Sequence, residues 1–277
     1  IELQPGEKFH GPEILLQILP SRDIESGTAD LHRYALKHLV PPVKEYPVIY
    51  NTWLDKMGAL DVKRLQRQLE AAVAVGCEAF VIDAGWYVML GDWREKEDAA
   101  FFGKMADFSA EVRAAGLRFG IWFEPESLSA DAPAIKEHPE FFQCTALQAD
   151  GKPGSRYRFR CENPDACQYY YDFLAKAIRK YHIGYIKFDM NHFLGYDDSG
   201  AELRGFATGW HQVMRRIQQD FPDVILENCS SGAMRTDLQT LRFFDTHFVS
   251  DNAEPWEVLR ISQGMLLRFP PGRILRW

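Results

Sequence analysis

The sequence has no long hydrophobic run. Among its 277 residues, no stretch approaches the ~20 consecutive apolar residues that a helix needs to cross a bilayer. Residues 1–11 contain neither the basic segment nor the apolar segment of a secretory signal. We therefore expect a soluble protein without a membrane partner.

Cysteine is also scarce, and its spacing follows no metal or disulfide pattern. The eight histidines form no His-Glu-x-x-His motif. The five cysteines are odd in number and lie outside the Cys-x-x-Cys and Cys/His spacings of zinc sites (Cys77, Cys144, Cys161, Cys167 and Cys229). The sequence therefore predicts free thiols in a reducing compartment, the cytoplasm, and gives no evidence for a metal site.

No charge of one sign dominates the chain. It has 32 Lys and Arg against 39 Asp and Glu, which gives a net charge of −7 without a long block of either sign. Attraction to a phosphate backbone is thus not the main interaction, and we do not expect nucleic acid as a partner. The 46% of hydrophobic residues is ordinary globular usage, so a packed core is expected.

Residues 1–45 differ in pattern from the remainder. Prolines and glycines interrupt short apolar runs such as residues 14–16, and one amphipathic stretch follows at 30–39. We expect a strand or two and a linker helix here.

From residue 48 onward, short runs rich in Val, Ile and Phe alternate with helical patterns. This alternation is typical of βα units and a parallel sheet. Six strands are expected, at 48–53, 79–83, 117–126, 185–191, 224–230 and 246–252, with a weaker seventh at 273–277. Because a closed (β/α)₈ barrel needs eight strands, we predict an α/β fold of the TIM-barrel type over residues 46–277 that is incomplete at its C-terminal end. The alternative is an overlooked strand, for which residues 156–161 are the candidate.

Capping residues predict where several helices begin and end. Asp61 is the expected N-cap of the first helix after residue 48, and Gly76 ends that helix. Asp165 is the expected cap of a later helix. Glu254 and Pro255 open the last one, with Pro in its first turn.

Polar residues gather where each expected strand ends. The carboxyl ends of parallel barrel strands open on one rim, which is where the active sites of this architecture lie. A single carboxylate at such a place is more often a helix cap or part of an ion pair, but here Lys, Trp and Asn accompany the carboxylates at one strand after another. The set comprises Asn51, Trp53, Asp83, Trp86, Glu124, Glu126, Lys187, Asp189, Asn191, Glu227, Asn228, Cys229, Asp251 and Asn252.

Asp189 and Asp251 are the most informative pair in this set. The period-two alternation of a strand places Lys187, Asp189 and Asn191 on one side. A lysine on the same side keeps the carboxylate ionised, as a nucleophile must be. Asp251 leaves a separate strand, and one ionised carboxylate opposite a protonatable one is the minimum machinery for cleaving a glycoside.

Aromatic residues near the strand ends fit a sugar substrate. Trp53, Trp86, Trp93 and Trp122 are candidates for stacking on apolar sugar faces, although a single Trp at such a position is more often part of the core. A thiol nucleophile at Cys229 is disfavoured, since no histidine lies near it in sequence and the carboxylate pair already supplies the chemistry. The Ser-Ser-Gly sequence at 230–232 lacks the elbow motif of serine hydrolases.

Six ordered motifs resemble family 36 of the glycoside hydrolases, the α-galactosidase or melibiase family. They are LVPPVKEYPVIYNTW, FVIDAGWY with GDW after it, LRFGIWFEPE, YIKFDMN, ENCSSGAMR and VSDNAEP, and they span about residues 40–271. The resemblance implies retaining hydrolysis of terminal α-galactosidic bonds, as in melibiose or raffinose, with no cofactor. It assigns Asp189 as the nucleophile that forms a galactosyl-enzyme and Asp251 as the acid/base.

The resemblance also suggests which residues bind the sugar. Lys187 and Asn191 match contacts to sugar hydroxyls beside the nucleophile, and Trp122 matches a tryptophan that lines the galactose subsite. Cys229 and Gly232 match a loop that faces the sugar 2-position. The segment around residue 156 aligns less securely, so either Arg156 or Arg158 represents the family arginine that reaches the site. With Asp83 and Trp86 these complete the predicted substrate-binding residues.

Two features depart from the family pattern. Many members have two adjacent aspartates before Gly-Trp that bind the galactose 4- and 6-hydroxyls, whereas this sequence has Asp83 followed by Ala84. A different α-linked sugar, including an N-acetylated one, therefore stays open. We expect residues 1–45 to represent only the tail of a preceding β-sandwich domain, and the chain to be a catalytic barrel without the β domain that usually follows it. Three further alternatives stay open. The enzyme transfers the sugar to a sugar acceptor, as raffinose and stachyose synthases do, or the barrel binds sugar without catalysing a reaction. The third is that the chain forms a homo-oligomer.

Overall fold

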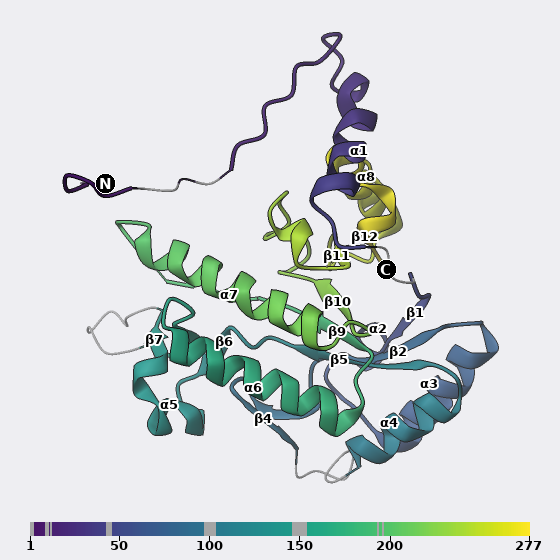
Figure 1. Cartoon of the computed structure of the whole chain (residues 1–277). Helices are drawn as coiled ribbons and strands as arrows, with labels where there is room; N and C mark the ends of the chain where they lie inside the picture. The colour runs from purple at the N-terminus through teal and green to yellow at the C-terminus, as the bar shows by residue number, and fades with distance from the viewer. Residues whose placement is uncertain are drawn as a thin grey trace.

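The computed structural model describes residues 3–8, 11, 13–42, 46–96, 104–145, 154–192, 194–195 and 197–277. At its centre is a sheet of seven parallel strands in the order β1-β2-β5-β9-β10-β11-β12 (Figure 1). All six expected strands and the weaker seventh are confirmed. They are β1 (Ile49–Asn51), β2 (Ala79–Ile82), β5 (Arg118–Phe123), β9 (Tyr185–Phe188), β10 (Ile225–Asn228), β11 (Thr246–Phe248) and β12 (Ile274–Leu275).

The sheet curls but does not close into a complete barrel. Its order begins at β1 and ends at β12, and in the described part of the chain these two edge strands are not paired with each other. A cavity of about 190 Å³ lies inside the curl and is lined by Ile49, Ile225 and Ile274, one residue from each of three strands. The predicted fold class, an incomplete (β/α) barrel, is therefore confirmed.

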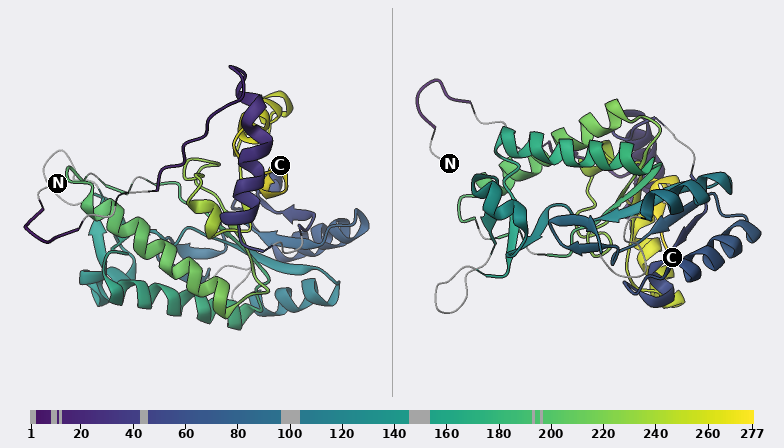
Figure 2. Two further views of the ribbon diagram at one scale, coloured as in Figure 1. Left: turned by 45° about the horizontal axis from the view of Figure 1, so that its top comes forward. Right: turned by 90° about the horizontal axis from the view of Figure 1, so that it is seen from below.

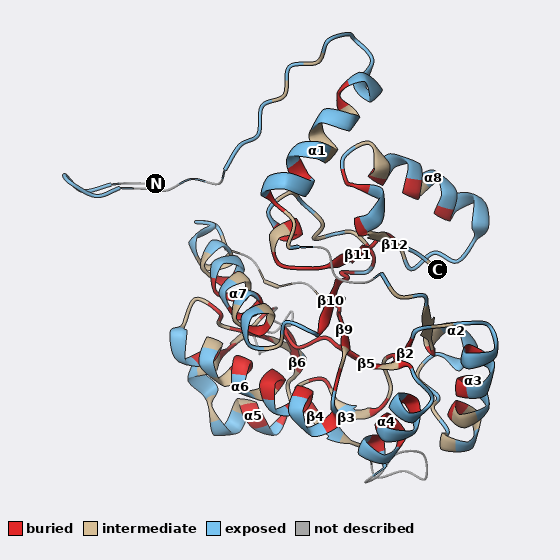
Figure 3. Cartoon of the chain, turned by 45° about the vertical axis from the view of Figure 1, so that its right-hand side comes forward, coloured by how far each residue is buried: buried red, intermediate tan, exposed pale blue. Residues whose placement is uncertain are grey.

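Helices cover the outer face of the sheet. In Figure 3 the strands are buried at the centre, while each helix exposes the side that points away from them. The α-helices are α1 (Thr28–His38), α2 (Trp53–Lys56), α3 (Val62–Ala74), α4 (Met105–Ala114), α5 (Pro133–Glu137), α6 (Pro164–Tyr181), α7 (Ala201–Asp220) and α8 (Pro255–Leu266).

Two of the three predicted helix caps are confirmed. Asp61 accepts a hydrogen bond from the Arg64 amide at 2.9 Å, and Glu254 accepts one from the Trp256 amide at 2.8 Å. The expectation for α6 was wrong by two residues. Asn163 caps this helix by accepting from the Asp165 amide, because Pro164 occupies the first helical position, where no backbone donor is needed.

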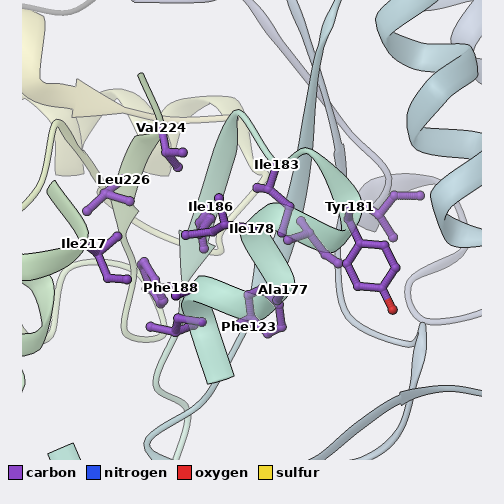
Figure 4. Close-up of a cluster of buried hydrophobic side chains, with 14 of the residues drawn as sticks. Phe123, Ala177, Ile178, Tyr181, Ile183, Ile186, Phe188, Ile217, Val224 and Leu226 are labelled. Carbon is purple, nitrogen blue, oxygen red and sulfur yellow. The ribbon is translucent and has the colours of Figure 1, made fainter. Parts of the chain in front are cut away.

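Alternation along the strands divides the side chains between two cores. Ile186 and Phe188 of β9 point outward and pack with Ile178 of α6 and Ile217 of α7 (Figure 4). Tyr185, one position away, points to the inside of the curl, where it packs with Val81 and Ile225. Every second residue along a strand faces the same side. The polar residues that lie two and four positions after Tyr185, at the end of the strand, therefore also face the inside.

Two small antiparallel sheets project from the carboxyl ends of central strands. The hairpin of β3 (Tyr87–Met89) and β4 (Asp92–Glu95) follows β2. A three-stranded sheet of β6 (Ser127–Ser129), β8 (Arg156–Phe159) and β7 (Phe142–Cys144) follows β5. Residues 156–161 thus contain a strand, as the alternative interpretation proposed, but it belongs to this inserted sheet and not to the barrel.

The N-terminal region contributes a helix to the barrel surface. Ala35 and Leu39 pack with Val249, Met265 and Phe269 in a separate apolar cluster, so α1 lies beside α8 (Figures 1 and 2). Residues 13–19, which precede α1, form no helix or strand, and they contact the rest of the chain through a Glu13–Arg242 ion pair at 2.6 Å and a hydrogen bond from Gln17 to the Gly27 carbonyl at 2.7 Å. Among the described residues of this region no strand is formed, contrary to expectation. No described helix is apolar enough over a sufficient length to span a bilayer.

Helices α6 and α7 approach each other closely at a glycine. A Cβ atom placed on Gly209 of α7 would lie only 1.7 Å from the carbonyl oxygen of Cys161, which precedes α6. Because this neighbour is backbone, it has little freedom to move aside. The close approach of the two helices therefore depends on the missing side chain at position 209.

Replacing Gly209→Ala should lower the free energy of unfolding by about 1–3 kcal/mol, as overpacking of a core does. Gly264→Ala is the matched control in α8, where nothing lies within 4 Å of the added Cβ. That variant should be more stable by about 0.5–1 kcal/mol, because alanine favours a helix interior over glycine. Urea unfolding measures both values, and equal effects of the two substitutions would contradict this account of the helix contact.

Candidate active site

A cavity of about 600 Å³ opens at the carboxyl ends of β2, β5 and β9. The inserted hairpin and the three-stranded sheet form part of its wall. The lining residues come from six separate segments of the chain. They are Trp53, Asp83, Ala84, Tyr87, Met89, Leu90, Trp122, Glu124, Ser129, Arg156, Lys187, Asp189, Asn191, His192 and Asp251. Asp189 and Asp251 therefore lie in the same cavity.

Hydrogen bonds hold the Asp189 carboxylate from several directions. Its Oδ2 atom accepts from the Trp122 indole at 3.1 Å and from the Asn191 amide group at 2.9 Å. Its Oδ1 atom accepts from the backbone amides of Met190 at 2.8 Å and Ser231 at 3.2 Å. A carboxylate that accepts from four donors has a fixed orientation, and these hydrogen bonds favour its ionised form.

The charge of Lys187 further stabilises the ionised form of Asp189. Burial opposes ionisation, but the lysine charge and the hydrogen bonds from Asn191, Cys229 and Trp122 outweigh it, so the pKa of Asp189 lies below its usual value. An aspartate in this state is a nucleophile that needs no base to activate it.

Lys187 is itself buried, with 2% of its surface exposed, beside a second carboxylate. Its Nζ atom lies 3.1 Å from Oδ2 of Asp83. Burial alone would lower the pKa of this lysine, yet the negative charges of Asp83 and Glu227 raise it, so the ammonium group stays charged. Asp83 also accepts from Asn51 at 2.7 Å and from the Ala84 amide at 2.8 Å, which fixes the carboxylate that pairs with the lysine.

Two aromatic rings cover the other side of the ammonium group. The Nζ atom of Lys187 lies 4.8 Å from the centre of the Phe248 ring and 5.1 Å from that of Trp277. The Trp277 indole also donates to the backbone carbonyl of Asp251 at 3.2 Å. Trp277 thus links the lysine to the segment that carries Asp251. The sequence pattern around Trp277 gave no sign of this role, because its strand was the weakest of those expected.

Asp251 has an environment opposite to that of Asp189. Partial burial and the negative charge of Asp189 raise the pKa of Asp251 above its usual value. Among the described residues, no side-chain donor is recorded for its carboxyl group, although its backbone carbonyl is held by Trp277. One carboxyl group of the cavity is therefore kept ionised, and the other retains a proton to higher pH.

Two further carboxyl groups lie near this pair. Glu227 is fully buried and accepts from the Tyr185 hydroxyl, and burial raises its pKa to about 7. Glu124 lines the cavity and accepts from Asn191 at 2.9 Å, and burial raises its pKa as well. Both were recognised at strand ends, but the sequence alone gave them no role.

The predicted aromatic residues divide into a wall and a layer behind it. Trp53 and Trp122 line the cavity, and Tyr87 stacks parallel to Trp122 with the ring centres 5.7 Å apart. Trp86 and Trp93 do not line it. The Trp86 ring is 1% exposed and donates to the Trp122 carbonyl at 3.1 Å, so it supports the wall from behind.

The loop after β10 also lies behind the cavity lining. The Cys229 side chain is fully buried and hydrogen-bonds to Asp189. Gly232 has a φ of +88°, and a Cβ at this position would lie 2.7 Å from Cα of Ser250, so the turn requires glycine. These two predicted residues shape the site without forming its surface in this structure.

The structure distinguishes between the two candidate arginines. Arg156 lines the cavity and donates to Ser129 at 3.2 Å. Arg158 is buried elsewhere, in ion pairs with Glu162 at 3.1 Å and Glu202 at 3.3 Å. Of the two, only Arg156 lines the cavity; it pairs in the sheet with Ser129, which lines the cavity too.

No metal centre is evident within the described ranges, where no group of three or more His, Cys, Asp or Glu side chains is arranged to hold a metal ion. The site instead offers one fixed anionic oxygen nucleophile, one proton donor and aromatic surfaces. This combination suits displacement at a carbon atom with protonation of the departing oxygen.

Comparison with known proteins gives a consistent family assignment. The melibiase family model matches residues 8–276. The chain is 26% identical to α-galactosidase Mel36A of Lactobacillus acidophilus, over 97% of this chain and 39% of that protein. It is 29% identical to an α-galactosidase of Escherichia coli, over 87% of this chain and 35% of that protein.

Solved structures show the same similarity. An α-galactosidase from Lactobacillus brevis superimposes with a TM-score of 0.82 at 27% identity, covering 92% of this chain and 36% of that one. The family 36 α-galactosidase AgaA of Geobacillus stearothermophilus, at 23% identity, has the same fold with a TM-score of 0.80, over 91% of this chain and 37% of that one. This chain therefore spans less than two fifths of the length of these relatives. Because the family model matches nearly the whole length of the chain, the chain belongs to the melibiase family of glycoside hydrolases.

Proposed function

We propose that this chain forms the catalytic barrel of a retaining α-galactosidase. The observation that carries the proposal is the presence of Asp189 and Asp251 in one cavity, with the pKa of the first lowered and that of the second raised. A difference of this kind separates a nucleophile from an acid/base in glycoside cleavage. The names of the relatives support galactose as the sugar.

The reaction has two displacements. In the first, Asp189 attacks the anomeric carbon, the bond from that carbon to the leaving oxygen breaks, and Asp251 gives its proton to this oxygen. In the second, Asp251 takes a proton from water, whose oxygen attacks the anomeric carbon and releases Asp189. Asn191 and Trp122 hold Asp189 in its orientation, the charge of Lys187 keeps it ionised, and Trp122 also offers an apolar face to the sugar ring.

The substrate class follows from the relatives and from one substitution. Structures of the AgaA relative contain raffinose or stachyose, which makes such oligosaccharides the first candidates here. Ala84 lines the cavity where many family members carry a second aspartate for galactose hydroxyls. This difference favours the second candidate, a related α-linked sugar such as N-acetylgalactosamine.

The cellular setting and the partners are also part of the proposal. The odd number of cysteines and their spacing, which fits neither a disulfide framework nor a zinc site, support a reducing compartment, the cytoplasm. An oligosaccharide is the expected partner, and transfer to a sugar acceptor is distinguished from hydrolysis by product analysis with excess acceptor. Free galactose as the sole product excludes the transferase.

Asp189→Asn should reduce turnover of an aryl α-galactoside by about 10⁴-fold or more, because the amide is a poor nucleophile. Asp251→Asn should reduce hydrolysis of raffinose by about 10²- to 10⁴-fold, the usual contribution of an acid/base. Asp107→Asn, an exposed aspartate on α4, is the control and should keep full activity. Undiminished turnover by the Asp189 variant refutes the nucleophile assignment.

The pH profile of kcat/KM should be bell-shaped. Activity is lost at low pH as Asp189 becomes protonated, below its lowered pKa, and lost at high pH as Asp251 loses its proton, above its raised pKa. A substrate with a p-nitrophenolate leaving group does not need protonation. With this substrate the residual activity of Asp251→Asn should show no decline on the alkaline side. If the decline of kcat/KM at high pH is unchanged in this variant, a group other than Asp251 causes it.

Ala84→Asp should raise kcat/KM for α-galactosides by about 10- to 100-fold, since a hydrogen bond to a charged group contributes about 1.5–3 kcal/mol. Ala84→Asn fills similar space without the charge and should give a smaller gain. Comparing α-galactoside and α-N-acetylgalactosaminide hydrolysis for the three proteins measures specificity. If the wild type prefers the N-acetylated substrate and the Asp variant reverses this, the sugar is N-acetylgalactosamine and the galactose assignment is wrong.

A further inference from the structure

Two cysteines outside the active site lie against each other. Cys161 follows β8, and Cys167 lies in the second turn of α6. The thiol of Cys167 donates to the carbonyl oxygen of Cys161 at 3.0 Å, so the two residues are in direct contact. Only five residues separate the two cysteines in sequence, and they form the turn into α6 and its first residues.

A second cavity gives small molecules access to this pair. It has a volume of about 650 Å³, lies between the α6 N-terminus and α7, and is lined by both cysteines. Small residues of α7 form much of the opposite wall, namely Ala201, Gly205 and Gly209. Cys167 is half-buried, whereas Cys161 is 3% exposed, so a reagent in the cavity reaches Cys167 first.

The environment also makes the two thiols unequal. The interaction with Cys161 lowers the pKa of Cys167 and outweighs its burial and the negative charge of Glu162, which both raise it; the charge of Arg216 adds a smaller lowering. Burial raises the pKa of the thiols of Cys77 and Cys229. Cys167 is therefore a better nucleophile toward disulfides than either of these.

From the contact between the two residues and the cavity that exposes them, we infer that Cys161 and Cys167 form a reversible disulfide by exchange with a small-molecule disulfide. The Cys167 thiolate attacks one sulfur of the reagent, which releases one small thiolate and leaves a mixed disulfide. Cys161 then gives its proton to solvent, attacks Sγ of Cys167 and releases the second small thiolate. Two protein thiols are oxidised, and one small disulfide is reduced to two thiols.

This modification site is independent of the proposed catalytic function. The new bond ties the end of β8 to α6, and β8 carries Arg156 of the candidate active site at its other end. A small dithiol reductant such as dithiothreitol reverses the reaction. The inference thus concerns a chemical property of the folded chain that is measured without a glycosidase assay.

The test uses the folded full chain and 2-hydroxyethyl disulfide as the reagent, followed by alkylation with iodoacetamide under denaturing conditions. Trypsin cleavage after Arg160 and Lys176 releases both cysteines in one peptide, residues 161–176. We expect this peptide to lose two hydrogen atoms and to carry no alkyl group. Two alkyl groups on the peptide, or a stable mixed disulfide at Cys167, would overturn the inference.

Single substitutions identify the order of events. Cys161→Ser should stop at the mixed disulfide on Cys167, whereas Cys167→Ser should leave Cys161 free to be alkylated. Cys77→Ala is the control and should leave the Cys161–Cys167 disulfide unchanged. Circular dichroism verifies that each variant is folded. If one variant does not fold, the wild-type peptide still shows whether the disulfide forms. A mixed disulfide on Cys161 in the Cys167 variant contradicts the assigned roles.

Discussion

The site depends on one buried cation. Lys187 has almost no contact with solvent, so its charge needs compensation from within the protein. Asp83 provides it by a direct contact at 3.1 Å, and Glu227 and Asp189 add negative charge nearby. In return the lysine keeps Asp189 ionised in a place where burial alone would favour protonation. Removing this charge would therefore disturb the ionisation of Asp189 and the packing around it at the same time.

The barrel places these groups by simple strand geometry. Lys187 of β9 is paired in register with Trp122 of β5 on one side and with Glu227 of β10 on the other. These three inward-facing residues therefore form one row across the sheet. Asp83 and Asp189 directly follow their strands and extend this row toward the rim. The sheet stays open between β1 and β12, yet the row is built from strands in the interior of the sheet order. Closure of the barrel is thus not what creates the site.

Sequence patterns predicted the parts that depend on local periodicity. The seven strands, the inward direction of Lys187 and the shared cavity of Asp189 and Asp251 follow from alternation and from the common rim of parallel strands. Features that depend on packing between distant segments were not predictable. Trp86 lies behind Trp122, Arg158 turns to Glu202, and Trp277 reaches across to Asp251. No local pattern encodes these three contacts, because each is fixed by a partner more than 25 residues away.

The central claim is that Asp189 stays ionised because of Lys187 while Asp251 retains its proton to higher pH. Carbon-13 NMR of the chain with labelled aspartate carboxyl groups measures both titrations directly, with the two asparagine variants providing the assignments. The account predicts that Asp189 titrates below 3.8 and Asp251 above it. Titration of Asp189 at a higher pH than Asp251 would contradict it.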